Sequence, residues 1–76
     1  MARTDYNRAV FRFAAKHDRE VRFRYAKGEK QAQIEERVVT PVSVKNGLVV
    51  GLDSDREDYR SYRLDRVLGE VTIVTL

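Results

Sequence analysis

The apolar residues of this chain change their spacing near Glu20, from the period of a helix to that of a strand. Before that point, Thr4 suits a helix N-cap, and Asp5 suits a first turn because negative charge is favourable at that end of the helix dipole. One arc at 100° per residue collects the apolar and ring-bearing side chains of this segment, namely Tyr6, Val10, Phe13, Ala14 and His17. We therefore expect a helix over about residues 4–17 that docks this arc on a core.

After Glu20, apolar residues alternate with charged ones, as in a strand with one buried face. Apolar Val21, Phe23 and Tyr25 are separated by two arginines. Further strands are expected over residues 31–44, 48–52, 59–64 and 69–76. Residues 48–52 are continuously apolar, which predicts a strand buried on both faces.

Turn signals connect these expected strands. Asn46 and Gly47 form the strongest hairpin signal, because both residues tolerate positive φ. Pro41 cannot donate a ladder hydrogen bond, so it marks a bend, a bulge or an edge. One helix and five short strands predict a mainly β fold, a small five-stranded antiparallel, SH3- or Sm-like, partly open barrel. Residues 1–76 are expected to form a single domain, with the barrel over about residues 20–75.

The charge of the chain is unevenly distributed. Its 76 residues include 15 Lys+Arg and 12 Asp+Glu, and the net charge of +3 is too small to prove a nucleic-acid partner. Residues 1–30 carry nine basic and four acidic side chains, a net charge of +5. Residues 31–59 have a net charge of −3 and residues 60–76 of +1. Folding can merge the two basic ends of the sequence into one face.

Several classes of protein are disfavoured by composition. The absence of cysteine excludes a disulfide scaffold and a thiolate metal site. No apolar run approaches the roughly 18 residues of a membrane span, and residues 1–5 do not resemble a signal peptide. We expect a cytoplasmic protein with no membrane contact, no metal site and no cofactor.

Catalytic signals are weak, so we expect a non-enzyme. The one histidine, His17, falls in the last turn of the expected helix, where positive charge is favourable for dipole reasons alone. A nucleophile, a base and an orienting group would have to converge, and serine occurs only at positions 43, 54 and 61. The acidic segment 53–58 lacks the central glycine and distal glutamate of an EF-hand, so a solvated loop is expected there.

Residues 60–67 carry three arginines, Arg60, Arg63 and Arg66, threaded through an apolar set. Arginine suits phosphate because its planar fork can donate two parallel hydrogen bonds, and neighbouring tyrosines offer surfaces on which bases stack. Either Asp65 neutralises these arginines locally or they bind an anion. Strand alternation places Arg60 on the face of Tyr62, at the barrel mouth, with Arg63 on the other face and Arg66 beyond the strand. This favours Arg60 as the residue that lines a cleft.

A second basic face is predicted on the helix. Arg8, Arg12 and Lys16 recur at i, i+4 and i+8 on the side opposite the apolar arc. A solvated helix face is the alternative interpretation of this stripe.

Four segments, in order, resemble the WYL domain family. Residues 21–25 are similar to its first strand, which ends in tyrosine after a helix, and residues 37–41 to its R-x-V-x-P element. Residues 60–67 are similar to its closing R-x-F/Y-R-L-D-R-I element. The naming Trp-Tyr-Leu triplet is replaced here by Leu48-Val49-Val50. The resemblance covers roughly residues 6–75, and the closing element is its most specific part.

The resemblance implies an Sm-like, SH3-type β-barrel that acts as a regulatory or effector-sensing module in bacterial or phage transcriptional regulators and in CRISPR-associated proteins. Some members bind single-stranded nucleic acid. Carried over by position, the ligand-binding candidates are Tyr25, Arg37, Arg60, Arg63 and Arg66. Reading of duplex DNA is not expected, because the roughly 20 residues before the first strand allow one helix and not a DNA-reading module.

Two functional hypotheses follow. In the first, a stand-alone, non-enzymatic WYL-type module binds an anionic ligand, single-stranded nucleic acid in particular, through an arginine-lined cleft. In the second, the chain is a protein-interaction or homo-oligomerisation module for a transcription or defence-system partner, because edge strands of a partial barrel can add strands.

Overall fold

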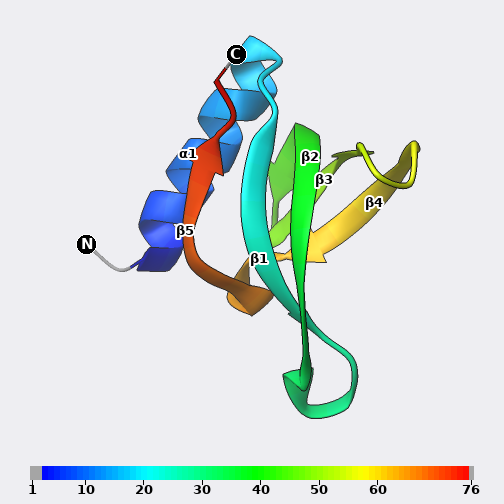
Figure 1. Cartoon of the computed structure of the whole chain (residues 1–76). Coiled ribbons are helices and arrows are strands. Elements are labelled where there is room, and N and C mark those ends of the chain that lie inside the picture. Colours follow the sequence, from blue (N-terminus) through cyan, green and yellow to red (C-terminus); the bar gives the residue numbers. More distant parts are fainter. Residues whose placement is uncertain (1–2, 76) are drawn as a thin grey trace.

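A computed structural model of the chain describes residues 3–75, apart from the side chain of Gln31. Helix α1 (Arg3–His17) is followed by β1 (Val21–Lys27), the 3-10 turn η1 (Glu29–Gln31), β2 (Gln33–Lys45), β3 (Leu48–Asp53), β4 (Asp58–Arg63), the 3-10 turn η2 (Leu64–Arg66) and β5 (Val67–Ile73). The strands form one antiparallel sheet in the order β4-β3-β2-β1-β5, with α1 beside β5 (Figure 1). The predicted fold class, mainly β with one N-terminal helix, is confirmed. The sheet is open, with β4 and β5 at its edges, and the likeness to SH3 and Sm barrels stays a prediction.

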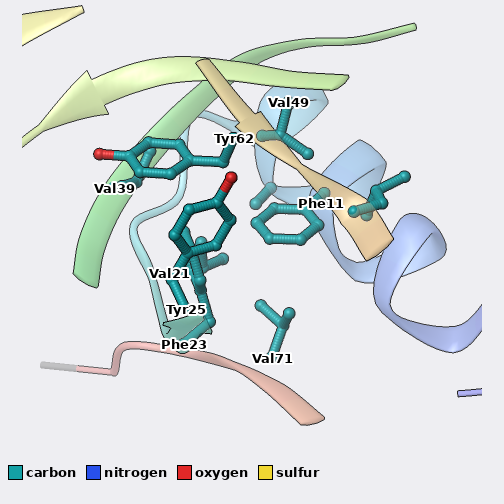
Figure 2. Close-up of a cluster of buried hydrophobic side chains, with 10 residues drawn as sticks. Phe11, Val21, Phe23, Tyr25, Val39, Val49, Tyr62 and Val71 are labelled. Carbon is teal, nitrogen blue, oxygen red and sulfur yellow. The ribbon is translucent and has the colours of Figure 1, made fainter. Parts of the chain in front are cut away.

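An aromatic cluster forms the centre of the core. The Phe23 ring meets Phe11 of α1 at 5.3 Å and Tyr62 of β4 at 5.4 Å between centroids, both nearly edge to face. Tyr25 meets Tyr62 at 5.2 Å in the same manner (Figure 2). Edge-to-face aromatic pairs each add about 0.5–1.5 kcal/mol beyond their buried area, so this cluster ties α1 to both halves of the sheet.

The helix packs on the sheet with a different side from the one predicted. Its buried residues are Asn7, Phe11 and Ala14, whereas Tyr6 is exposed and Phe13 is 47% exposed. The prediction of which side of α1 faces the core is therefore wrong, because the buried side is rotated by part of a turn from the predicted arc. The cause is Asn7, a polar residue that the hydrophobic pattern could not place in the core but that hydrogen-bonds to β5.

Asn7 also closes one edge of the sheet. Its Nδ2 donates to the Gly69 carbonyl oxygen at 2.9 Å, and its Oδ1 accepts from the Val71 N–H at 2.9 Å. The side-chain amide thus takes the place that the backbone of a neighbouring strand would occupy along β5. Asn7 is buried, and the bond from Val71 is fully shielded from water, whereas the bond to Gly69 is part-buried.

The other edge strand, β4, is also occupied by side chains. Leu64 N–H donates to the Gly47 carbonyl in the β2–β3 turn, so the N–H groups of Arg63 and Tyr59 point the opposite way, since backbone groups alternate along a strand. Arg63 N–H donates to the Tyr25 hydroxyl, and Tyr59 N–H to Asp58 Oδ1, at 2.9 and 2.8 Å. Such blocking reduces pairing with a further strand.

The β2–β3 hairpin confirms the turn predicted at Asn46-Gly47 and the irregularity predicted at Pro41, and it corrects the burial predicted for residues 48–52. Asn46 and Gly47 have positive φ, 53° and 76°, and the register shifts just after Pro41. The run 48–52 is not buried on both faces, because Leu48 is 42% exposed and burial alternates along β3. The core lies on one face of β3 only, since α1 packs against β2 and β5 on the core side.

Candidate anion-binding cleft

A cleft of about 370 Å³ lies between the start of α1, the β2–β3 turn and η2; we call it the α1–η2 cleft. Its lining residues are Thr4, Arg8, Asn46, Gly47, Leu48, Arg63, Leu64 and Asp65. Arg8 and Arg63 are 55 positions apart in sequence and are brought together only by the docking of α1 near η2. The cleft therefore joins the predicted helix stripe to the predicted closing element.

Both arginines of the cleft are held by exposed carboxylates. Arg63 Nη2 lies 2.6 Å from Asp65 Oδ2, and the Arg63 side chain is 56% exposed. Arg8 Nη1 lies 2.9 Å from Asp5 Oδ1. Exposed ion pairs contribute only about 0–1 kcal/mol. An incoming anion can therefore replace either carboxylate at small cost.

The aromatic core positions Arg63. Tyr25 is buried, and its hydroxyl accepts the Arg63 N–H at 2.9 Å. Leu64 is buried next to it and is fixed by its N–H bond to Gly47. The backbone of Arg63 is therefore anchored on both sides, while its exposed side chain is held only by the ion pair with Asp65. Tyr25 therefore supports the cleft by accepting a hydrogen bond from the Arg63 backbone, and it does not line the cleft.

Arg37 lies elsewhere, inside a set of carboxylates. Its side chain is only 12% exposed and contacts Asp53 Oδ2 at 3.2 Å and Asp55 Oδ2 at 3.0 Å. Glu35 Oε2 lies 3.9 Å from Arg37 Nε. The charge of Arg37 is thus largely compensated within the chain, and a ligand would have to displace these carboxylates to reach it.

Asp53 is the residue that sequence analysis missed. It was assigned to a solvated loop, but it ends β3 and its side chain is fully buried. Oδ2 accepts a short hydrogen bond from the Tyr62 hydroxyl, and Oδ1 accepts the N–H groups of Asp55 and Arg56 at 2.9 and 3.2 Å. The alternation Val49, Gly51, Asp53 on the core face was the signal that could have placed it.

The environment of Asp53 keeps its carboxylate charged. Burial alone would raise the pKa of Asp53, but the Tyr62 hydrogen bond, the two backbone N–H groups and the Arg37 charge outweigh it, and the pKa is lowered from 3.8. Burial and the contact with Asp53 in turn raise the pKa of Tyr62 well above its ordinary value of 10.0. Asp53 and Tyr62 therefore form a fixed charged node that ties the β3–β4 loop to the core.

The remaining predicted residues lie at different depths. Arg60 is exposed on β4 and has no ion-pair partner within the part of the chain that is described, yet it does not line the α1–η2 cleft. Arg66 is half-buried in η2, and its Nε has no hydrogen-bond partner among residues 3–75. On α1, Arg12 and Lys16 are exposed, as the basic stripe predicts.

Across residues 3–75, no group of three or more His, Cys, Asp or Glu side chains is arranged to hold a metal ion. None of the helices in this range is long and apolar enough to cross a membrane.

The fold and the cleft together define a small β domain with two arginines, Arg8 and Arg63, on one surface cleft. The chain matches the family model of the WYL domain over residues 7–73 and belongs to that family, which confirms the resemblance seen in the sequence. No curated protein matches the chain. Among solved structures, proteasome accessory factor B/C (PafBC) of Arthrobacter aurescens is similar, with a TM-score of 0.67 and 27% sequence identity. The similarity covers 93% of this chain and 11% of that one, so the chain spans a small part of that protein's length.

These comparisons give the general class of function. The chain is a regulatory domain of the ligand-sensing kind, as WYL domains in general are, and such domains are non-catalytic modules. WYL regulators in general bind nucleic acids or other ligands.

Proposed function

We propose that this WYL domain, a single domain over residues 1–76, senses an anionic ligand, single-stranded nucleic acid, through the α1–η2 cleft. The observation that carries the proposal is the convergence of Arg8 and Arg63 on that cleft from distant parts of the chain. Two guanidinium groups on one cleft offer the planar, paired donors that phosphate oxygens accept.

Binding proceeds by exchange of anions. A phosphate takes the place of Asp65 on Arg63 and of Asp5 on Arg8, so the two arginines keep a counter-charge throughout. The backbone hydrogen bonds of Arg63 and Leu64 already hold the site in place, so little conformational freedom remains to be lost when the ligand binds. Tyr25 acts as a support for Arg63, and Arg37 as a support for the β3–β4 loop.

The other predicted arginines extend the positive field. Arg60 is exposed on the edge strand and Arg66 is half-buried in the turn that follows Arg63. Arg12 and Lys16 continue the stripe of Arg8 along α1. Such a field raises the rate of encounter with a polyanion and weakens as salt is added.

Fluorescence anisotropy with a labelled eight-nucleotide oligothymidylate, at two salt concentrations, tests the proposal. Binding is expected at low salt, and Arg63→Ala and Arg8→Ala should each weaken it and reduce the salt slope by about one. Arg22→Ala is the matched control, because Arg22 is an exposed arginine on β1 that pairs with Glu36 away from the cleft. No binding at low salt, or equal losses for all three variants, would refute the proposal.

A second candidate function is contact with a regulatory protein or a second copy of the chain. The observation that favours it is the aromatic flank of α1, where Tyr6 is exposed and the rings of Phe13 and His17 lie 4.4 Å apart. Exposed apolar groups that gather in one place mark contact surfaces. Size-exclusion chromatography with light scattering tests it: a mass above 8.9 kDa that falls on Phe13→Ser supports the contact.

A further inference from the structure

The side of the sheet away from the core carries three cross-strand rows on β2, β3 and β4. Facing residues in the register form the rows Thr40–Leu52–Tyr59, Ser43–Val50–Ser61 and Lys45–Leu48–Arg63. We call this surface the outer platform. Its middle column is aliphatic, and Tyr59 is 60% exposed at one end. An aromatic ring and a row of aliphatic side chains on one face form an exposed apolar surface of the kind that marks a binding site.

The outer platform continues into the α1–η2 cleft. Leu48 and Arg63 belong to both, because they form the last row of the platform and part of the lining of the cleft. A ligand bound to Arg63 in the cleft therefore has an uninterrupted surface ahead of it along β3 and β4.

Charge is distributed unequally along the platform. Lys45 and Arg63 flank Leu48 at the end next to the cleft. Tyr59 lies at the other end, next to Asp58 and the acidic β3–β4 loop. A polyanion is attracted at the first end and repelled at the second, so its phosphates belong near Arg63 and only an uncharged part can lie on Tyr59.

The length of the platform fits a few nucleotides. Tyr59 and Arg63 are four residues apart on one strand, about 13 Å at the usual rise. A strand stacked at about 3.4 Å per nucleotide needs about four nucleotides to span that distance, and an extended strand needs fewer. At this spacing one nucleotide held at Arg63 covers only about a quarter of the backbone distance to Tyr59.

We infer that the outer platform is a base-stacking track, on which single-stranded nucleic acid anchored by a phosphate at Arg63 lays a base against the Tyr59 ring. The inference rests on the proposed function and extends it from one cleft to a strand of about four nucleotides. Base stacking on an aromatic ring tolerates any sequence, so the track reads the presence of a single strand and not its sequence.

Tyr59→Ala provides the test, in the full chain and with the same eight-nucleotide oligothymidylate. We expect binding to weaken about 5- to 100-fold, the range for loss of one aromatic stacking partner. The salt slope should stay unchanged, because stacking releases no counterions, whereas Arg63→Ala lowers it. Thymidine monophosphate, used as a competitor, should bind Tyr59→Ala and the unchanged protein equally.

Two variants control the test. Tyr59→Phe keeps the ring and should bind as tightly as the unchanged protein. Tyr6→Ala removes an exposed tyrosine of α1 that belongs neither to the platform rows nor to the lining of the α1–η2 cleft, and it should have no effect. Tyr59 is exposed and its side chain is outside the core, so circular dichroism of Tyr59→Ala should match the unchanged protein.

The outcomes separate this inference from the proposed function. Arg63-dependent binding that is unchanged by Tyr59→Ala overturns the track and leaves the cleft standing. Absence of any oligonucleotide binding at low salt overturns both. A dimer that Leu52→Glu converts to a monomer would show that the platform is an interface between copies, and that result also overturns the track.

Discussion

Replacing Asn7 with alanine should destabilise the domain far more than a change at a helix surface normally does. Asn7 makes two hydrogen bonds to β5, a part-buried one from its Nδ2 to the Gly69 carbonyl and a buried one from the Val71 N–H to its Oδ1. Alanine leaves both backbone groups without their partner. The Val71 N–H is the more costly of the two, because Val71 is itself 3% exposed and water cannot replace the amide.

The size of the effect follows from three contributions. A buried donor or acceptor that loses its partner costs about 1–3 kcal/mol, and two groups are affected. Alanine recovers roughly 0.5 kcal/mol, because it forms helix more readily than asparagine. We therefore expect a loss of about 1.5–5.5 kcal/mol in the free energy of unfolding. A domain of this size has about 4–11 kcal/mol in total, so the loss is a large fraction.

Urea unfolding followed by far-UV circular dichroism at 25 °C measures this loss. With a slope of about 1–2 kcal/mol/M, the midpoint should fall by about 1–5 M. Arg12→Ala is the matched control, since Arg12 is an exposed residue of the same helix, and it should stay within about 0.5 kcal/mol of the unchanged protein. If Asn7→Ala were no more destabilising than Arg12→Ala, the idea that Asn7 closes the β5 edge would be wrong.

Three further predictions concern the core and its charged node. Gly51→Ala should cost about 1–3 kcal/mol in urea unfolding, because its Cβ would lie 2.5 Å from Val39 Cγ1 and 2.7 Å from the Thr40 carbonyl oxygen; a change below 0.5 kcal/mol would contradict this. Tyr62→Phe should cost about 1–3 kcal/mol by removing a donor from the buried Asp53 carboxylate, and an unchanged midpoint would contradict it. Because the pKa of Asp53 is lowered from 3.8 in the folded state, its stabilising contribution is complete above that value and is lost as pH falls through the folded-state pKa. The difference in urea midpoint between the unchanged protein and Asp53→Asn should therefore shrink below about pH 4, and a constant difference down to pH 2 would refute this assignment.

Local patterns in the sequence were enough to predict most of the fold. Alternation from Val21 onward located β1, and the Asn46-Gly47 pair located the β2–β3 turn, because both signals depend on neighbours in the chain. The register shift at Pro41 followed from its missing N–H.

Features that depend on distant contacts could not be predicted in the same way. The rotation of α1 is set by Asn7 bonding to residues 62 and 64 positions away, and a hydrophobic pattern assigns a polar residue to the surface. The run at 48–52 appeared buried on both faces because sequence does not show that one face of β3 lacks a covering element within the described range.

The candidate site was predicted in part. The two arginines of the cleft were both candidates from the sequence, since Arg63 belonged to the predicted ligand-binding residues and Arg8 to the predicted basic face of the helix. Their meeting on one cleft, and the absence of Arg60 from its lining, depend on how α1 docks. Whether these residues bind a ligand stays a prediction that the binding experiments address.

The side chains that block the two edges of the open sheet affect how such a domain behaves inside a larger protein. When a domain is part of a multidomain chain or an assembly, copies face one another at high local concentration, and exposed edges then exchange strands and misassemble. Here Asn7 fills one edge, and Tyr25 and Asp58 bind N–H groups on the other. Side-chain blocking of this kind reduces strand exchange between copies of the domain wherever they meet.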